Sequence, residues 1–71
     1  MQLSVLDQSP IRQGGSAAQA FQETLALAQL TEALGFHRFW VSEHHSTDAL
    51  AGSAPEILMA ALAQHTRHIR I

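Results

Sequence analysis

The sequence has 71 residues, no cysteine, no lysine and a net charge of −2 with histidine neutral. These values exclude a disulfide scaffold and the basic face that grips nucleic acid. Hydrophobic residues make up 46% of the chain and charged residues 14%, which is typical of a globular protein. No apolar run approaches the roughly 20 residues of a membrane span, and the N-terminus lacks a signal-like core. A soluble, cytoplasmic protein with no nucleic-acid or membrane partner is therefore expected.

Residues 3–6 are mostly apolar and are followed by the turn residues of 7–10, which predicts a first strand near 3–7. A helix is expected over 16–34. Ser16 and Gln19 have the spacing of a capping box, and Gly35 supplies a typical helix end. Helical spacing predicts an apolar side on this helix, formed by Phe21, Leu25, Leu27, Ala28, Leu30 and Leu34.

The second strand is expected over 38–43. Its bulky Phe39-Trp40-Val41 core indicates burial on both sides, as in parallel sheets, and places Trp40 in the core. A second helix is expected over 54–66, with a possible capping box at Ser53 and Glu56 and Pro55 in its first turn. Its apolar side is expected to contain Ile57, Leu58, Ala61 and Leu62.

A third strand is expected to begin at 69–71. The spacing of about 30–35 residues between strands matches a repeated β-α unit and predicts an α/β fold with parallel strands. Right-handed crossovers would put both helices on one face of the sheet and leave the other face bare. In a (β/α)8 barrel of about 250 residues the rest of the barrel covers that face, and in a doubly wound sheet further helices do. Residues 1–71 are therefore expected to be the N-terminal portion of a barrel domain, its β-α-β-α-β start, and an incomplete barrel.

Polar groups gather at the predicted carboxyl ends of these strands, where α/β proteins place their chemistry. Asp7 follows the first strand, although Asp is also a common turn residue, and Glu43, His44 and His45 follow the second. Side chains alternate along a strand, so Glu43 and His45 should share one side and His44 the other. Histidine suits acid/base chemistry because its pKa lies near neutrality. The alternative is a metal-dependent hydrolase barrel with Glu43 and His45 as ligands, although the first strand lacks a His-x-His pair.

Two further histidines, His65 and His68, fall near the end of the second helix. We expect them to be surface or capping residues.

The run from Phe39 to His45 resembles the second-strand signature of the bacterial luciferase-like flavin-dependent monooxygenases. Residues 3–10 are similar to the first strand of the alkanal monooxygenase-like branch, and 34–38 and 53–56 are similar to later segments. The resemblance runs in order over the whole chain. It implies a (β/α)8 flavoprotein, an oxidoreductase that uses reduced FMN and O₂ on an aldehyde-like or other small organic substrate. A flavin reductase would supply the reduced FMN. A close variant of this interpretation has a deazaflavin in place of FMN, since relatives with the same barrel use one.

His44 matches the acid/base histidine that this family places near the flavin, and is predicted to be catalytic. Glu43, His45 and Asp7 are predicted to help bind the cofactor. In the family the flavin phosphate is gripped by loops late in the barrel, so the 71 residues alone are expected to be inactive. The intact protein is expected to form a homo- or heterodimer. A non-enzymatic remnant that pairs with another chain is the third interpretation.

Overall fold

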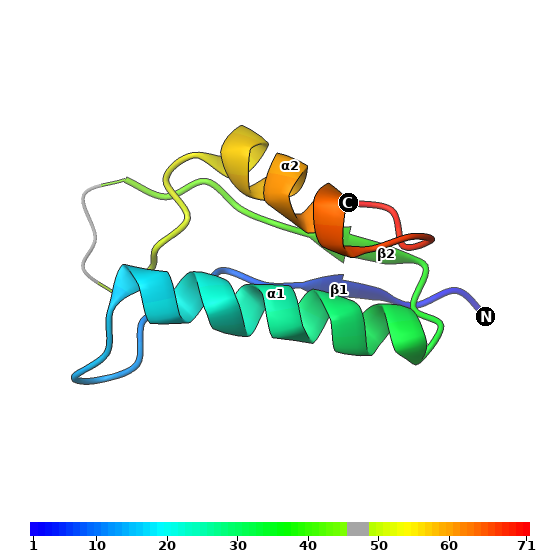
Figure 1. Cartoon of the computed structure of the whole chain (residues 1–71), viewed down its shortest axis with the longest axis horizontal. Helices are drawn as coiled ribbons and strands as arrows, with labels where there is room; N and C mark the ends of the chain where they lie inside the picture. The colour runs from blue at the N-terminus through cyan, green and yellow to red at the C-terminus, as the bar shows by residue number, and fades with distance from the viewer. Residues whose placement is uncertain (46–48) are drawn as a thin grey trace.

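The computed structural model describes residues 1–45 and 49–71. The elements follow in the order β1 (Ser4–Leu6), α1 (Ala17–Ala33), β2 (Arg38–Trp40) and α2 (Pro55–His65), as Figure 1 shows. The two strands are parallel neighbours, with Ser4 opposite Arg38 and Leu6 opposite Trp40. The predicted alternation of strands and helices and the parallel pairing are therefore confirmed.

The third strand is reduced to one parallel bridge, between Arg38 and Arg70. The Phe39 N–H donates to the Arg70 carbonyl oxygen (2.6 Å), and the Arg70 N–H donates to the His37 carbonyl oxygen (3.3 Å). The predicted third strand thus has the expected place and direction, but only one residue of it pairs. β2 also ends at Trp40 and not at residue 43, because the backbone beyond it bonds to a loop: the His44 N–H donates to the Gly52 carbonyl oxygen (2.5 Å).

The ends of α1 follow local sequence signals. Ser16 is the N-cap, and its hydroxyl oxygen accepts the backbone N–H of Gln19 at 3.2 Å, which satisfies one of the free donors of the first turn. After the helix, Gly35 has a φ of +85°, and the Phe36 N–H donates to the Thr31 carbonyl oxygen at 3.0 Å. This is the hydrogen bond of a Schellman motif, which needs a left-handed residue in the position of Gly35. Both predicted ends of α1 are confirmed.

The predicted capping box of α2 is wrong. The N-cap is Ala54, which has no side-chain cap hydrogen bond. Ser53 lies one position too early, and its backbone N–H donates to the Ala51 carbonyl oxygen (2.9 Å). Pro55 is in the first turn as expected, and Glu56 provides a negative charge there, which the helix dipole favours.

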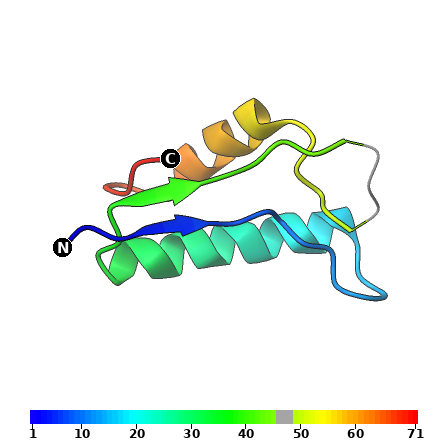
Figure 2. The ribbon, with the colours of Figure 1, turned by 180° about the vertical axis from the view of Figure 1, so that it is seen from behind.

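Both helices cover the same face of the strand pair. Figure 2 shows the strands from behind, in front of both helices. The core between the layers is built around Phe39 from β2, Ala28 from α1, Leu62 from α2 and Ile69 from the third-strand segment, all buried. The single-face arrangement agrees with the right-handed crossover predicted from the sequence.

The expected apolar side of α1 is confirmed at Ala28, which is buried, and at Leu25 and Leu27, which pack against the core, but the rest of the buried stripe differs from the expected one. Small side chains occupy it, whereas Leu30 and Leu34 are more than half exposed. Small residues allow the helix backbone to approach the strands closely, so bulk is not what marks the inner side here. In α2 the expected Leu62 is buried and Leu58 is partly buried, but Ile57 is exposed. The buried residues of α1 are Ala20, Thr24, Ala28 and Thr31.

The opposite face of the strand pair carries exposed apolar side chains. Leu6 is 61% exposed and Trp40 is 52% exposed, while Phe39, the neighbour of Trp40, is fully buried. The Arg38 guanidinium lies 5.7 Å from the centre of the Trp40 ring, on the same face. The prediction that Trp40 lies in the core is therefore wrong for this chain, because side chains alternate along a strand and both helices lie on the Phe39 side.

Candidate active site

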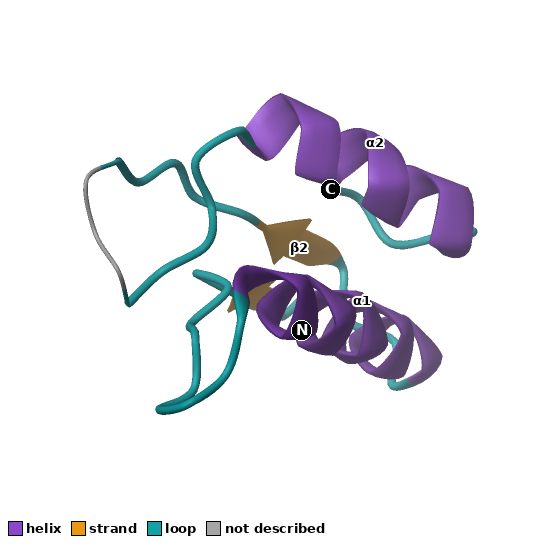
Figure 3. Cartoon of the chain, turned by 60° about the vertical axis from the view of Figure 1, so that its left-hand side comes forward, coloured by secondary structure: helices purple, strands orange, loops and turns teal. Residues whose placement is uncertain are grey.

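The two long loops that follow the strands lie at one end of the molecule (Figures 1 and 3). They contact each other through an antiparallel bridge between Pro10 and Leu50. The Ile11 N–H donates to the Ala49 carbonyl oxygen (2.8 Å), and the Ala51 N–H donates to the Ser9 carbonyl oxygen (2.9 Å). The carboxyl ends of both strands thus meet at one edge, where the sequence placed the candidate chemistry.

Glu43 and His45 lie together on one side of the segment that follows β2. The His45 Nε2 is 2.7 Å from the Glu43 Oε2. This contact confirms the predicted shared side, since side chains two residues apart in an extended segment lie on the same side. Both side chains are more than half exposed, so the pair contributes little to stability.

Alternation along the chain places His44 on the other side of this segment, together with Ser42. Val41 packs against the core beside Phe39, so alternation puts Ser42 and His44 on the side of Trp40. The Ser42 Oγ and the His44 Nε2 are both buried, and neither has a hydrogen-bond partner within residues 1–45 and 49–71. Buried polar atoms nearly always have a partner, and leaving one unpaired costs about 1–3 kcal/mol. This pair of atoms therefore suits a polar ligand.

Ser42 was not among the residues selected from the sequence. Serine is common in loops, so its identity carries no signal. Its position, two residues before His44 in an extended segment, is the one feature that would have pointed to it.

Asp7 lies on the helix side of the strand pair. Its Oδ2 accepts a hydrogen bond from the Thr24 hydroxyl at 2.5 Å, and Thr24 is also bonded to the Ser9 hydroxyl at 2.7 Å. In residues 1–45 and 49–71, no hydrogen bond or ion pair joins Asp7 to the segment 43–45. The structure thus gives Asp7 a contact with α1, and its part in cofactor binding stays a prediction.

The described residues bring no three acidic or histidine side chains together as a metal centre would need. Glu43 and His45 form a pair, and the structure shows no third ligand beside them in residues 1–45 and 49–71. His65 and His68 are exposed, and the His65 Nδ1 lies 2.9 Å from the Ala61 carbonyl oxygen at the end of α2. The prediction that these two are surface or capping residues is confirmed.

Glu32 joins α1 to the segment before the third-strand bridge. Its Oε2 accepts the backbone N–H groups of Arg67 (2.7 Å), His68 (2.5 Å) and Ile69 (3.0 Å). The hydrogen bond from His68, followed by those from Ile69 and Arg67, lowers the pKa of the Glu32 carboxyl below its usual value, because all three favour the charged form. This contact orients the chain entering the third strand and takes no part in the candidate site.

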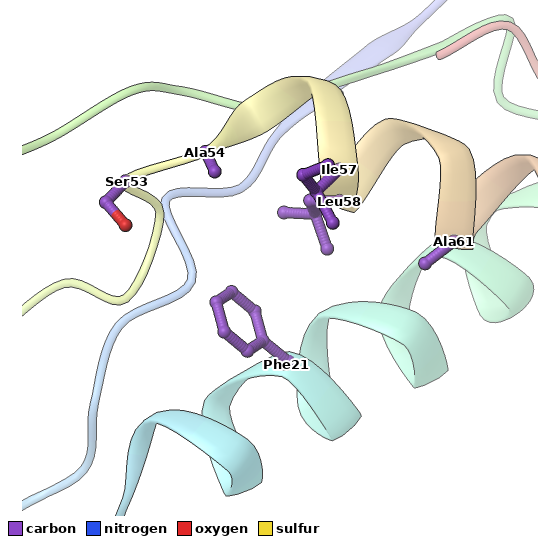
Figure 4. A pocket seen from close by; sticks show the side chains of 6 residues that line it. All are labelled: Phe21, Ser53, Ala54, Ile57, Leu58 and Ala61. Atoms are coloured by element: carbon purple, nitrogen blue, oxygen red, sulfur yellow. The ribbon is translucent and has the colours of Figure 1, made fainter.

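An apolar groove of about 360 Å³ lies between the start of α2 and α1 (Figure 4). It belongs to the helix layer, and none of the predicted site residues lines it. A groove without polar side chains at its walls, apart from one serine, does not supply acid/base groups. Its lining residues are Phe21, Ser53, Ala54, Ile57, Leu58 and Ala61.

Parallel strands joined by helices on one face, with polar groups at their carboxyl edge, define the chain as the opening of a (β/α)8 barrel. A family model described as luciferase-like monooxygenase matches residues 1–71, and the chain belongs to this family. No helix in residues 1–45 and 49–71 is both long and apolar enough to cross a membrane.

Named relatives support the family assignment. The chain is 55% identical over 71 residues to the N-acetyl-S-alkylcysteine monooxygenase of Bacillus subtilis (strain 168), covering all of this chain and 21% of that protein. The crystal structure of apo-MsnO8 matches with a TM-score of 0.94 and 45% identity, over 97% of this chain and 21% of that one. The oxygenating constituent of 3,6-diketocamphane monooxygenase from Pseudomonas putida, in complex with FMN, matches with a TM-score of 0.86 and 30% identity, over 97% and 19%. The chain thus spans about a fifth of the length of these relatives.

Proposed function

We propose that residues 1–71 form the N-terminal portion of the barrel domain of an FMN-dependent monooxygenase, called the parent protein below. The observation that carries this proposal is the match to an FMN-bound monooxygenase over 97% of the chain at 30% identity. The parent protein would act in the cytoplasm as a homo- or heterodimer, with reduced FMN delivered by a flavin reductase. Bound reduced FMN would supply the electrons with which O₂ is used to oxidise a small organic substrate.

His44 is the residue we propose for proton transfer at the site. Its Nε2 is buried and unpartnered in the described part of the chain, and alternation places its side chain on the side of the strand pair that neither helix covers. A buried imidazole nitrogen with no protein partner is free to hold or donate a proton to a bound group. Glu43 and His45, paired on the other side of the segment, would support the site from its rim.

The substrate class extends from aldehyde-like compounds to other small organic molecules. A relative at 55% identity is named for N-acetyl-S-alkylcysteine, so a thioether of this type and a linear aldehyde are the first two substrates to test. The isolated 71-residue chain is proposed to be inactive, because it spans about a fifth of its relatives.

The parent protein should bind FMN and consume O₂ with substrate only when the flavin is reduced. The variant His44→Ala should lower turnover about 10²–10⁴-fold, the usual contribution of a positioned acid/base group, while the circular dichroism spectrum stays unchanged. His68→Ala, an exposed histidine in another segment, is the matched control and should keep full activity. Full activity in His44→Ala together with loss of activity in His45→Ala would show that His45, and not His44, carries out the proton transfer. Loss of activity with a chelator, in a protein that binds no FMN, would favour the metal-dependent hydrolase.

A further inference from the structure

The Ser42 hydroxyl is a buried polar group that the proposed function leaves without a role. We infer that Ser42 is a ligand-binding residue, whose Oγ makes a hydrogen bond to the same bound molecule that His44 reaches with its Nε2. This inference rests on the proposed function and names a contact within that site. It is based on three features of the segment that follows β2: the alternation of its side chains, the contacts that hold its backbone in place, and the burial of two of its polar atoms.

Alternation places the two unpartnered atoms on one side. Val41 packs against the core, and Glu43 pairs with His45 at 2.7 Å. By alternation, these three odd-numbered residues share one side of the segment. Ser42 and His44 remain on the opposite side, with Trp40. Two residues of extended chain span roughly 6.6 Å, at about 3.3 Å a residue. One small polar ligand or one fused ring system covers that length.

The backbone of this segment is held in place by the loop that precedes α2. The Gly52 carbonyl oxygen accepts the His44 N–H at 2.5 Å. Gly52 is buried, and a Cβ on it would lie 2.9 Å from the Ser42 carbonyl oxygen. The loop thus contacts the backbone on both sides of residue 43. A hydroxyl on an anchored backbone loses little further freedom when it binds a ligand, which favours affinity.

Because the two atoms are buried, their missing hydrogen bonds are costly, and this cost favours the binding of a polar ligand. Of the buried side-chain nitrogen and oxygen atoms in residues 1–45 and 49–71, the Ser42 Oγ and the His44 Nε2 are the two without a hydrogen-bond partner. A hydroxyl both donates and accepts, and the imidazole nitrogen does either according to its tautomer. The ligand that suits both is a polar edge with a carbonyl oxygen or ring nitrogen. Either the flavin ring or a carbonyl-bearing substrate provides such an edge.

The test compares Ser42→Ala with Ser4→Ala in the parent protein. Ser4 is an exposed serine in β1, opposite Arg38 in the register, so it provides the same chemical change away from the strand-end loops. Three quantities are measured: the Kd for oxidised FMN by fluorescence quenching, the KM for substrate, and the melting temperature without ligand. Removing one hydrogen bond to a ligand should weaken binding about 2–10-fold.

We expect Ser42→Ala to keep or raise the melting temperature of the ligand-free protein, since it deletes an unpaired buried hydroxyl. A higher Kd for FMN assigns the contact to the flavin, and a higher KM with unchanged Kd assigns it to the substrate. If Ser42→Ala matches Ser4→Ala in Kd and KM, or lowers only the melting temperature, Ser42 is structural and the inference is wrong. A wild-type parent protein that binds no FMN overturns the proposed function as well, and this is seen before any variant is compared.

Discussion

The Thr24 hydroxyl links the end of β1 to α1, and its removal should destabilise the fold measurably. Thr24 is 2% exposed. Its one hydroxyl proton is donated to the Asp7 Oδ2 at 2.5 Å, so the Ser9 hydroxyl, 2.7 Å away, must donate to the Thr24 Oγ1. The substitution Thr24→Val keeps the shape of the side chain and removes both hydrogen bonds.

The expected loss follows from the surroundings of the two partners. Ser9 is 1% exposed, so its hydroxyl is left buried without an acceptor, at a cost of about 1–3 kcal/mol. The half-buried Asp7 carboxyl loses the hydrogen bond that the Thr24 hydroxyl donates to it, and a hydrogen bond from water compensates for part of this loss. We expect Thr24→Val to lower the free energy of unfolding of the parent protein by about 2–4 kcal/mol.

The matched control is Thr31→Val on the same helix, where the change in helix propensity is the same. Thr31 is also buried, but its hydroxyl donates to the Ala28 carbonyl oxygen of its own helix (3.1 Å), so its loss should cost only about 0.5–1.5 kcal/mol. Urea unfolding, followed by circular dichroism, measures both variants. Combining Thr24→Val with Ser9→Ala should show a coupling of about 0.5–3 kcal/mol. Equal losses for the two valine variants, with no coupling to Ser9, would refute the proposed chain of hydroxyls.

Three further predictions concern other contacts. Because its folded-state pKa is lowered, Glu32 stabilises the fold above the ordinary carboxyl pKa of about 4.3, and this contribution is lost as the pH falls through the lower folded value. In Glu32→Gln, the free energy of unfolding should therefore fall less steeply with decreasing pH in this acid range. An unchanged pH dependence of unfolding would contradict the assignment. Gly52→Ala puts a Cβ 2.9 Å from the Ser42 carbonyl oxygen and should cost about 1–3 kcal/mol of stability in urea unfolding; wild-type stability would show that the loop adjusts freely. In the isolated chain Phe39→Ala should lower the soluble fraction, since deleting a buried Phe costs about 3–5 kcal/mol, whereas Trp40→Gln should raise it by removing an exposed apolar group; the same sign for both, measured by sedimentation, would refute the bare-face description.

The sequence by itself determined those features that depend on neighbours along the chain. Ser16 caps α1 and Gly35 ends it because capping and left-handed turns are settled within four or five residues. The parallel pairing of β1 with β2 followed from the spacing of about 30–35 residues between strands joined by a helix, and the single helix face followed from the handedness of the crossover. The grouping of Glu43 and His45 on one side, away from His44, needed only the two-residue period of extended chain. The family resemblance rested on short runs of this kind, and the match over residues 1–71 agrees with it.

Tertiary structure decided what each side chain contacts. Trp40 and Phe39 are adjacent and equally apolar, yet the helices cover only one of them, and no local pattern distinguishes the two sides. Thr24 is buried with its hydroxyl bonded to Asp7 and Ser9, which lie 17 and 15 positions away along the chain, and a polar residue with distant partners cannot be recognised from periodicity. Ser42 is a candidate because its hydroxyl is buried without a partner and the loop around Gly52 lies against its backbone, and both features belong to the folded chain. Burial and hydrogen-bond pairing are properties of the packed layers, which is why the site could be located from the sequence but not completed from it.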